Sequence, residues 1–218
     1  MGLVISWRAS IGGRACAAVA GVVLVCAGLT GCGGGSSVVM ESGAGRSSGG
    51  AALEPVIATA VYAPIDDNTA DIYLTDLTRR ELDGSVSTER LSGSIVHIYL
   101  FINPTPGRTP IDRGAVSAVV RYIVLARGET GVYGGGGFLR PDSKPGGGSI
   151  SGSMREGSMR LVQATEGFRD LLGPSTLDLS FNATRDEGMA RLISSRLIAA
   201  IDEADVVAED DPMIDVGP

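Results

Sequence analysis

Residues 95–102 have the sequence IVHIYLFI, which is the strongest β-strand signal in this chain of 218 residues. Successive side chains of a strand point to opposite faces of its sheet. One face of this segment is therefore aliphatic (Val96, Ile98, Leu100, Ile102), and the other carries Ile95, His97, Tyr99 and Phe101. A strand that is apolar on both faces is expected in the centre of a sheet, because neither face can be left in water.

The segments next to this strand extend the β pattern. Residues 103–107, NPTPG, contain two prolines that cannot donate ladder hydrogen bonds, so the strand is expected to end there in a turn. Residues 115–126 then form a second long run rich in Val and Ile. We expect this second run to pair with the central strand.

Other short β-type runs lie on both sides of this pair and are separated by turn residues. They are residues 56–62, 70–77, 131–139, 149–154, 158–164 and 176–183. Many short strands at such spacing are typical of a sandwich or a barrel. The sequence therefore predicts a mainly β fold, an antiparallel β-sandwich or barrel-like domain.

The last part of the domain has a helical pattern instead. Apolar residues recur on one helical face at Met189, Leu192, Ile193, Leu197, Ala200 and Ile201. The preceding residues 184–187, TRDE, fit a capping box in which Thr184 is the N-cap. We predict one amphipathic helix from about 185 to 203, packed through its apolar stripe on an open side of the sheet. The alternative is that this stripe docks a partner.

The N-terminal segment has the organisation of an export signal. Arg8 and Arg14 provide positive charge, residues 15–28 are apolar, and residues 29–32 are Leu-Thr-Gly-Cys. This tetrapeptide resembles the lipobox of bacterial lipoproteins. The resemblance implies cleavage before Cys32, a thioether link from Cys32 to diacylglycerol, and acylation of the new amino group. Cys32 is the one site residue that we assign.

Two other interpretations of this segment are an uncleaved membrane anchor and an ordinary cleaved signal peptide. The 17 residues from 15 to 31 are fewer than the roughly 20 apolar residues that a spanning helix needs. Cys16 and Cys26 lie in the segment that would be removed, so Cys32 would be the single cysteine of the mature chain. Lipidation would occupy a thiol that is otherwise reactive in an oxidising compartment.

These features predict four parts of the chain. Residues 1–31 are the signal peptide, 32–52 the lipidated cysteine with a flexible Gly/Ser/Ala tether, 53–204 the folded domain, and 205–218 an acidic disordered tail. Removal of the signal leaves 16 basic and 25 acidic residues, a charge of −9. This charge argues against nucleic acid as a partner. For the tail, a calcium or partner role is the less favoured alternative.

Candidate catalytic groups are few. His97 is the only histidine, so a zinc site with two or three histidines is excluded, and a Ser-His-Asp hydrolase would have to use His97. The sequence contains no Gly-x-Ser-x-Gly motif. We therefore expect His97 to be a hydrogen-bonded structural residue or a surface residue, and we predict no cofactor.

The glycine-rich segment 131–138, GVYGGGGF, lacks the Gly-Lys-Ser/Thr of a phosphate-binding loop. We expect a bulged or kinked strand that another backbone or side chain approaches closely. The alternative is that Gly134 to Gly137 form a flexible lip over a ligand groove.

Two groups of carboxylates and the five tyrosines have both functional and structural interpretations. Asp66, Asp67 and Asp71 form one group, and Asp76, Glu81 and Asp83 the other. They could supply an Asp/Glu pair for glycan hydrolysis or a calcium site, although neither spacing fits an EF-hand. The tyrosines (Tyr62, Tyr73, Tyr99, Tyr122, Tyr133) could form a sugar- or peptide-binding platform. Solvated turns and core edges are the structural alternatives.

Taken with the resemblance, these observations predict a membrane-anchored bacterial lipoprotein with a non-catalytic binding or assembly role at the cell envelope. Its expected partners are the lipid bilayer, through acylated Cys32, and an envelope protein or glycan. It would face the periplasm or the exterior. In a cell with two membranes, Gly33 favours the outer one, because lipoproteins retained in the inner membrane commonly have Asp there. The alternative function is an envelope hydrolase that cleaves glycan through an Asp/Glu pair.

Overall fold

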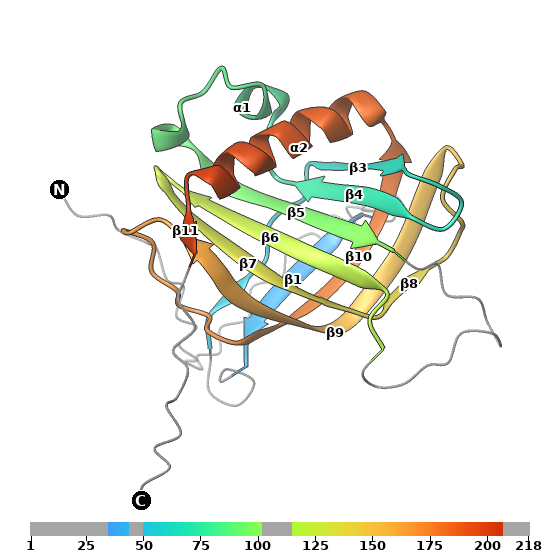
Figure 1. Ribbon diagram of the computed structural model, residues 1–218, viewed down its shortest axis with the longest axis horizontal. Helices are drawn as coiled ribbons and strands as arrows, with labels where there is room; N and C mark the ends of the chain where they lie inside the picture. The colour runs from blue at the N-terminus through green and yellow to red at the C-terminus, as the bar shows by residue number, and fades with distance from the viewer. Residues whose placement is uncertain (1–34, 44–49, 102–114, 207–218) are drawn as a thin grey trace, which may run out of the picture. The chain divides into compact units, whose positions relative to one another are not determined.

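A computed structural model of the chain describes residues 35–43, 50–101 and 115–206 (Figure 1). Cys32, the rest of the expected signal segment and residues 207–218 of the expected tail lie outside these residues. So do the two prolines of residues 103–107. Within the described residues, no helix is both long and apolar enough to cross a membrane.

As the sequence predicts, the domain is mainly β. The described residues form eleven strands in one sheet. The strands are β1 (Ser37–Ser42), β2 (Ala52–Leu53), β3 (Thr59–Pro64), β4 (Ala70–Thr75), β5 (Ser92–Leu100), β6 (Ala118–Ala126), β7 (Glu129–Gly137), β8 (Leu139–Pro141), β9 (Ser149–Ala164), β10 (Ser175–Arg185) and β11 (Asp205–Val206). The helical elements are α1 (Arg79–Leu82), the 3-10 turn η1 (Thr88–Arg90) and α2 (Glu187–Asp202).

The sheet closes on itself, which makes the domain barrel-like. Strands β3, β4, β5, β6, β7, β9 and β10 follow one another as hydrogen-bonded neighbours, and all these pairs are antiparallel. The ring is completed where β10 pairs in parallel with β3, through Thr184 opposite Val61 and Arg185 opposite Tyr62. Figure 1 shows the curved sheet with β3 and β10 meeting near the start of α2.

The central position expected for the IVHIYLFI segment is confirmed. Strand β5 lies between β4 and β6, with Ile98 opposite Ile72 on one side and Val120 on the other. Val96, Ile98 and Leu100 are fully buried inside the closed sheet. The inner side chains form one continuous core, which also contains Tyr62, Tyr122 and Tyr133.

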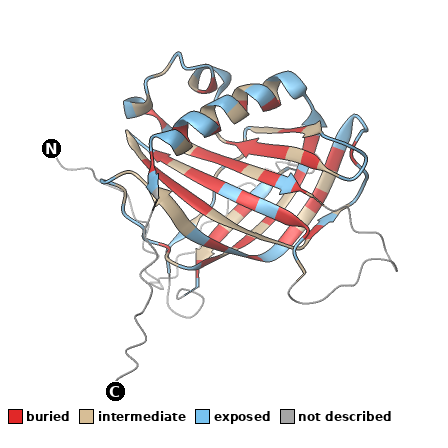
Figure 2. Ribbon diagram, in the orientation of Figure 1, coloured by how far each residue is buried: buried red, intermediate tan, exposed pale blue. Residues whose placement is uncertain are grey.

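Helix α2 packs on the outer face of the sheet, where it contacts β3, β4 and β7. Its buried residues are Ala190, Ile193, Leu197 and Ala200, and Met189, Leu192 and Ile201 are partly buried beside them. Beneath the helix, a second core contains outward-facing residues such as Tyr73, Ile95 and Ile123. Figure 2 shows this helix with an exposed outer side and a buried side. The predicted amphipathic helix and its packing on the sheet are therefore confirmed.

The predicted N-cap of this helix is wrong. Thr184 lies in β10, where its pairing with Val61 keeps the backbone extended. The N-cap is Asp186, two residues later, and its side chain accepts a hydrogen bond from the Met189 amide at 2.8 Å. A capping box occurs instead at α1, where Glu81 accepts a hydrogen bond from the Thr78 amide at 2.7 Å.

The expectation of a flexible tether over residues 32–52 is also wrong for its central part. Residues 37–42 form β1, which pairs along its length with β10, and Val38 and Met40 are buried in the inner core. Strand β3 pairs with β10 over only two residues, so most of that edge of β10 is free to pair with β1. The folded domain therefore includes Ser37, sixteen residues before the predicted boundary at 53.

Two further boundaries differ from expectation. The runs 149–154 and 158–164 form one strand, β9, because an irregularity in its pairing with β10 replaces the expected break. Glu156 has a positive φ of 54° at this irregularity, and its amide donates to the Asp178 carboxylate at 2.7 Å. The first two residues predicted for the acidic tail, Asp205 and Val206, form β11 and pair with β9.

Candidate functional site

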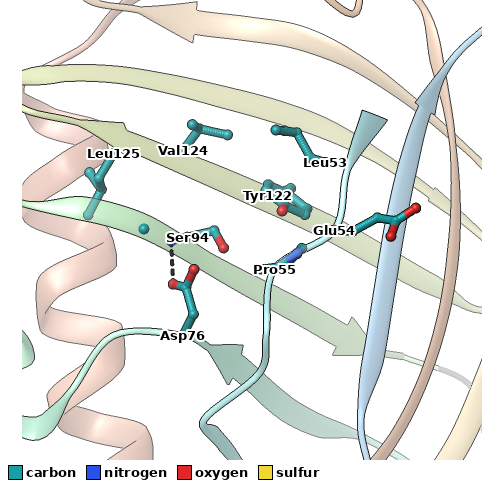
Figure 3. A pocket seen from close by; sticks show the side chains of 9 residues that line it. Leu53, Glu54, Pro55, Asp76, Ser94, Tyr122, Val124 and Leu125 are labelled. Carbon is teal, nitrogen blue, oxygen red and sulfur yellow. Dashed lines mark hydrogen bonds between the residues drawn. The ribbon is translucent and has the colours of Figure 1, made fainter. Parts of the chain in front are cut away.

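A small pocket lies on the inner side of the sheet, between β5, β6 and the segment that connects β2 to β3 (Figure 3). Its volume is about 250 Å³. We call it the Ser94 pocket. Its polar lining includes Asp76, Ser94 and Tyr122, and its apolar lining includes Leu53, Pro55 and Val124.

Strand alternation places the polar residues of the pocket on one face. Ile72 and Leu74 of β4 point inward, so Asp76, just beyond the end of β4, continues that face. Ser94 precedes Val96 by two residues on β5 and therefore points inward as well. Ser94 is opposite Val124 and Val96 is opposite Tyr122, so Ser94 and Tyr122 are diagonal neighbours.

Hydrogen bonds to the backbone hold Asp76 and Ser94 in place. The Ser94 amide donates to Asp76 Oδ1 at 2.6 Å. The Thr75 hydroxyl donates to the Ser94 carbonyl at 2.7 Å and accepts from the Leu77 amide at 3.0 Å. A side chain at Gly93 would displace these groups, because a Cβ at this position would lie 2.7 Å from Asp76 Oδ1 and 2.6 Å from the Leu77 side chain.

The Ser94 hydroxyl has no hydrogen-bond partner among the described residues, although Ser94 is only 5% exposed. A buried polar group without a partner costs about 1–3 kcal/mol. Such groups are uncommon in native proteins, and each one calls for an explanation. The hydroxyl is therefore the clearest sign in this pocket of a group that a ligand would satisfy.

Tyr122 forms part of the same pocket and is 1% exposed. Burial raises the pKa of Tyr122 to about 12; the nearby Ser94 hydroxyl partly offsets this effect, and the Asp76 carboxylate adds to it. The Ser94 hydroxyl is near enough to Tyr122 to influence its pKa, but it meets the distance and angle criteria for no hydrogen bond within the described residues. The phenol is neutral throughout the physiological range, so it can donate or accept a hydrogen bond but is not a nucleophilic phenolate.

This pKa predicts a loss of stability at high pH. The unfolded phenol ionises near pH 10 and the folded one only near 12, so the stabilisation is complete below pH 10 and falls between pH 10 and 12. The expected slope is about 1.4 kcal/mol per pH unit for each such phenol. Burial also raises the pKa of Tyr133, so we compare urea unfolding of the wild type and Tyr122→Phe across this window. If the free energy of unfolding fell equally steeply with pH in both proteins, the loss of stability could not be due to Tyr122.

The carboxylates expected to form a pair for glycan hydrolysis do not come together at this pocket. Glu54 lines the pocket with Asp76, but Figure 3 shows its carboxylate pointing away from Asp76. Asp66 accepts hydrogen bonds from the Asn68 and Thr69 amides at 2.7 and 2.8 Å, and these bonds lower its pKa.

Most of the remaining carboxylates noted in the sequence lie in turns or helix caps, where they form local hydrogen bonds or are exposed. Glu81 caps α1, and Asp83 accepts from the Ser85 amide at 2.9 Å. Their pKa values are lowered, first by hydrogen bonds from Thr78 and Ser85 respectively. Asp67 is exposed in the turn before β4. Among the described residues, no three His, Cys, Asp or Glu side chains are grouped so that they could hold a metal ion.

His97 lies on the outer face of β5, away from the inner core. Its Nε2 is 2.7 Å from Asp71 Oδ1, and its ring stacks on Tyr73 with centroids 4.7 Å apart. Both contacts join β5 to β4. In the described part of the chain no serine hydroxyl bonds to His97, so the Asp-His pair lacks the third member of a hydrolytic triad.

The glycine-rich segment forms β7 and its continuation, with a register shift in its pairing with β9 between Val132 and Tyr133. A Cβ on Gly135 would lie 1.8 Å from the Ser158 carbonyl oxygen, so another backbone approaches closely, as expected. Gly134, Gly135 and Gly136 also line a surface pocket of about 560 Å³ beside Val116 and Arg160.

The tyrosines do not form a shared platform. Tyr62, Tyr122 and Tyr133 are in the inner core and Tyr73 is in the outer core, so Tyr99 is the exposed one, at 37%. Tyr133 donates to Asp170 Oδ1 at 2.7 Å. Four of the five tyrosines are therefore buried in the two cores, and one of them, Tyr122, also lines the Ser94 pocket.

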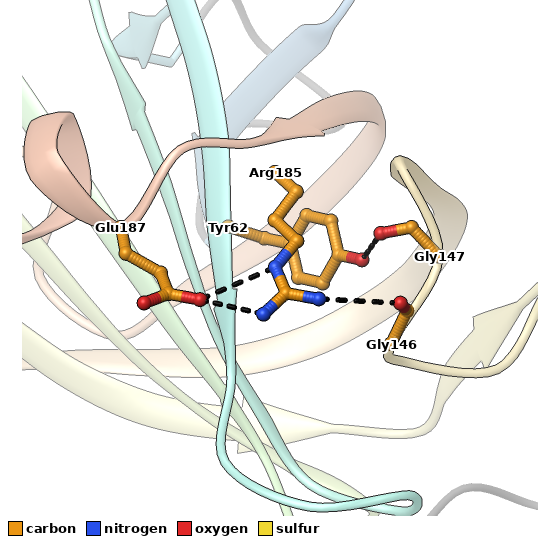
Figure 4. A network of polar contacts seen from close by, with 5 residues as sticks. All are labelled: Tyr62, Gly146, Gly147, Arg185 and Glu187. Carbon is orange, nitrogen blue, oxygen red and sulfur yellow. Dashed lines mark hydrogen bonds and ion pairs between the residues drawn. The ribbon is translucent and has the colours of Figure 1, made fainter.

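Tyr62 belongs to a polar network that fastens the turn between β8 and β9 (Figure 4). Its hydroxyl donates to the Gly147 carbonyl, and Arg185 donates to the Gly146 carbonyl at 3.3 Å. Arg185 also pairs with Glu187 at 2.7 Å, which links the end of β10 to the first turn of α2. These groups are occupied by structural contacts.

Asp76 and Tyr122 were each candidates from the sequence, in separate groups, whereas Ser94 was not. The signal that could have found Ser94 is a hydroxyl at an inward position of the most apolar strand, in line with Val96, Ile98 and Leu100. No protein-family model, curated protein or solved structure matches this chain.

Proposed function

We propose that this chain is a bacterial lipoprotein, held at the membrane by acylated Cys32, whose β domain binds an envelope component without changing it chemically. The observation that carries the binding role is the Ser94 pocket, in which a buried hydroxyl has no partner among the residues that the structure describes. The proposal places the domain in the periplasm or at the cell exterior, on the outer membrane in a cell that has two.

The position of β1 bears on how far the domain can lie from the lipid. Ser37 is five residues after Cys32. At about 3.3–3.6 Å per residue, that length of chain reaches at most about 18 Å. The pairing of β1 with β10 therefore supports a domain held near the membrane surface rather than on a tether of twenty residues.

The polar groups of the Ser94 pocket support binding over hydrolysis. Glycosidases use two carboxylates that flank the scissile bond. Here Asp76 is bonded to the Ser94 amide, and the Glu54 carboxylate points away from it. Tyr122 is a neutral phenol. This set offers hydrogen-bond acceptors to a ligand.

An assay on purified peptidoglycan separates binding from the alternative hydrolase. Protein extracted from membranes is incubated with peptidoglycan, and soluble fragments are measured by chromatography. We expect the wild type to release no more soluble fragments than the Asp76→Asn variant does. Release by the wild type that is lost in Asp76→Asn would overturn the proposal and favour a glycan hydrolase.

Replacement of Cys32 by alanine tests the anchor. We expect Cys32→Ala to accumulate as a precursor that retains residues 1–31, because the lipidation that precedes cleavage needs the thiol. Cell fractionation and immunoblotting against wild type measure this, with Cys26→Ala as the matched control that should be processed normally. Normal processing of Cys32→Ala would show that an ordinary signal peptide is removed instead.

A further inference from the structure

Three oxygen-bearing side chains of the Ser94 pocket surround one small space. Ser94 and Tyr122 point inward from β5 and β6, and Asp76 continues the inward face of β4 just beyond the end of that strand. Asp76 Oδ1 takes the hydrogen bond from the Ser94 amide, so Oδ2 is the oxygen that remains for a ligand. Figure 3 shows the three side chains around the space beside Pro55.

The charge of the lining is one-sided. It includes two acidic residues, Asp76 and Glu54, and no Lys, Arg or His. Glu54 is an exposed residue of the pocket lining, so its charge would attract a cation from solution. A positively charged ligand is therefore the electrostatic complement of this pocket.

The apolar walls of the pocket limit what the uncharged part of the ligand can be. Leu53, Pro55, Val124 and Leu125 are apolar, and they suit an aliphatic chain more than a sugar ring with hydroxyls on every side. Ligand pockets for drug-sized molecules have volumes of roughly 300–1,000 Å³. At about 250 Å³, the Ser94 pocket suits a smaller molecule.

We propose that the Ser94 pocket binds the primary ammonium group of a small alkylamine, which donates to Asp76 Oδ2, Ser94 Oγ and Tyr122 Oη. A primary ammonium has three donors and no acceptor, so one group satisfies all three oxygens. The inference rests on the binding role proposed above and names the ligand class for it. Ammonium binding gives the buried Ser94 hydroxyl the partner that it lacks within the described chain.

The test uses butylammonium chloride as the probe and 1-butanol as its neutral counterpart. Both are titrated at pH 7 into ¹⁵N-labelled protein extracted in detergent, and dissociation constants are taken from the amide shifts of Ser94 and its neighbours. We expect butylammonium to bind at least about tenfold more tightly than 1-butanol, because hydrogen bonds to charged groups are the stronger ones.

Three variants assign the effect to the pocket. Asp76→Asn keeps an oxygen that can accept from the Ser94 amide but removes the charge, and it should weaken butylammonium binding about tenfold or more. Ser94→Ala should weaken it severalfold without lowering the melting temperature, because the hydroxyl has no partner to lose in the described part of the chain. Glu166→Gln removes an exposed charge outside the pocket and should leave binding unchanged.

Near-ultraviolet circular dichroism of each variant verifies that the fold is retained. Equal affinity for the two probes, or butylammonium binding that survives both Asp76→Asn and Ser94→Ala, would overturn the ammonium assignment. Binding of 1-butanol alone, weakened by Ser94→Ala, would overturn it too but would leave a binding pocket. Failure of the proposed function has a separate readout, the release of peptidoglycan fragments.

Discussion

Replacement of Gly135 by alanine is expected to cost roughly 3 kcal/mol or more of the free energy of unfolding, at the upper end of overpacking effects. A Cβ at this position would lie 1.8 Å from the Ser158 carbonyl oxygen and 2.9 Å from the Met159 sulfur. The first of these is a backbone atom in the strand that pairs with β7, so a side-chain rotation cannot relieve the clash. The two strands must separate locally, which disturbs the closed ring.

The matched control is Gly148→Ala in the other glycine run. A Cβ added at Gly148 would have no atom within 4 Å apart from those of its neighbours in the chain, and the φ of this residue is not positive. We expect a change within about 0.5 kcal/mol, as for most surface substitutions. Urea unfolding of both variants, followed by circular dichroism, measures the difference. Equal stabilities for Gly135→Ala and Gly148→Ala would contradict the close approach of β7 and β9.

Met40→Ala is expected to destabilise the domain by about 2–5 kcal/mol, the usual cost of removing a large apolar side chain from a core. Met40 is 0% exposed and packs in the inner core from β1. A flexible tether would place no side chain in the core, so the same substitution would then have almost no effect. This variant therefore tests directly whether the folded domain includes residues before 53.

The control for Met40→Ala is its neighbour Val39, which is only partly buried and lies on the other face of β1. Val39→Ala should cost clearly less than Met40→Ala in the same urea titration. A loss below about 0.5 kcal/mol for Met40→Ala, the range of ordinary surface changes, would restore the tether interpretation.

The fold class could be predicted from sequence because its main signals are local. The alternation in residues 95–102 and the helical spacing from Met189 to Ile201 each depend on one element, and both are confirmed. Strand β1 was missed because its pattern is a short run, SVVMES, in a segment dominated by Gly and Ser. Its stability comes from the edge of β10, more than 130 residues away, which no local pattern reveals.

The candidate site depends even more on distant contacts. Asp76 was noted within an acidic group, but its neighbours in that group, Glu81 and Asp83, cap local turns instead. Its partners in the pocket come from β5 and β6, and strand register alone brings them together. Likewise, the pairing of His97 with Asp71 follows from β4 lying beside β5. Neither arrangement produces a regular spacing of residues along the chain, so neither can be detected from the sequence.

The anchor at Cys32 is the claim from which the proposed location of the domain follows. Intact mass spectrometry of the protein extracted from the membrane fraction tests it most directly. We predict the mass of residues 32–218 increased by diacylglycerol and one further acyl chain. A mass that includes residues 1–31, or a mature chain that begins elsewhere and carries no lipid, would contradict the account.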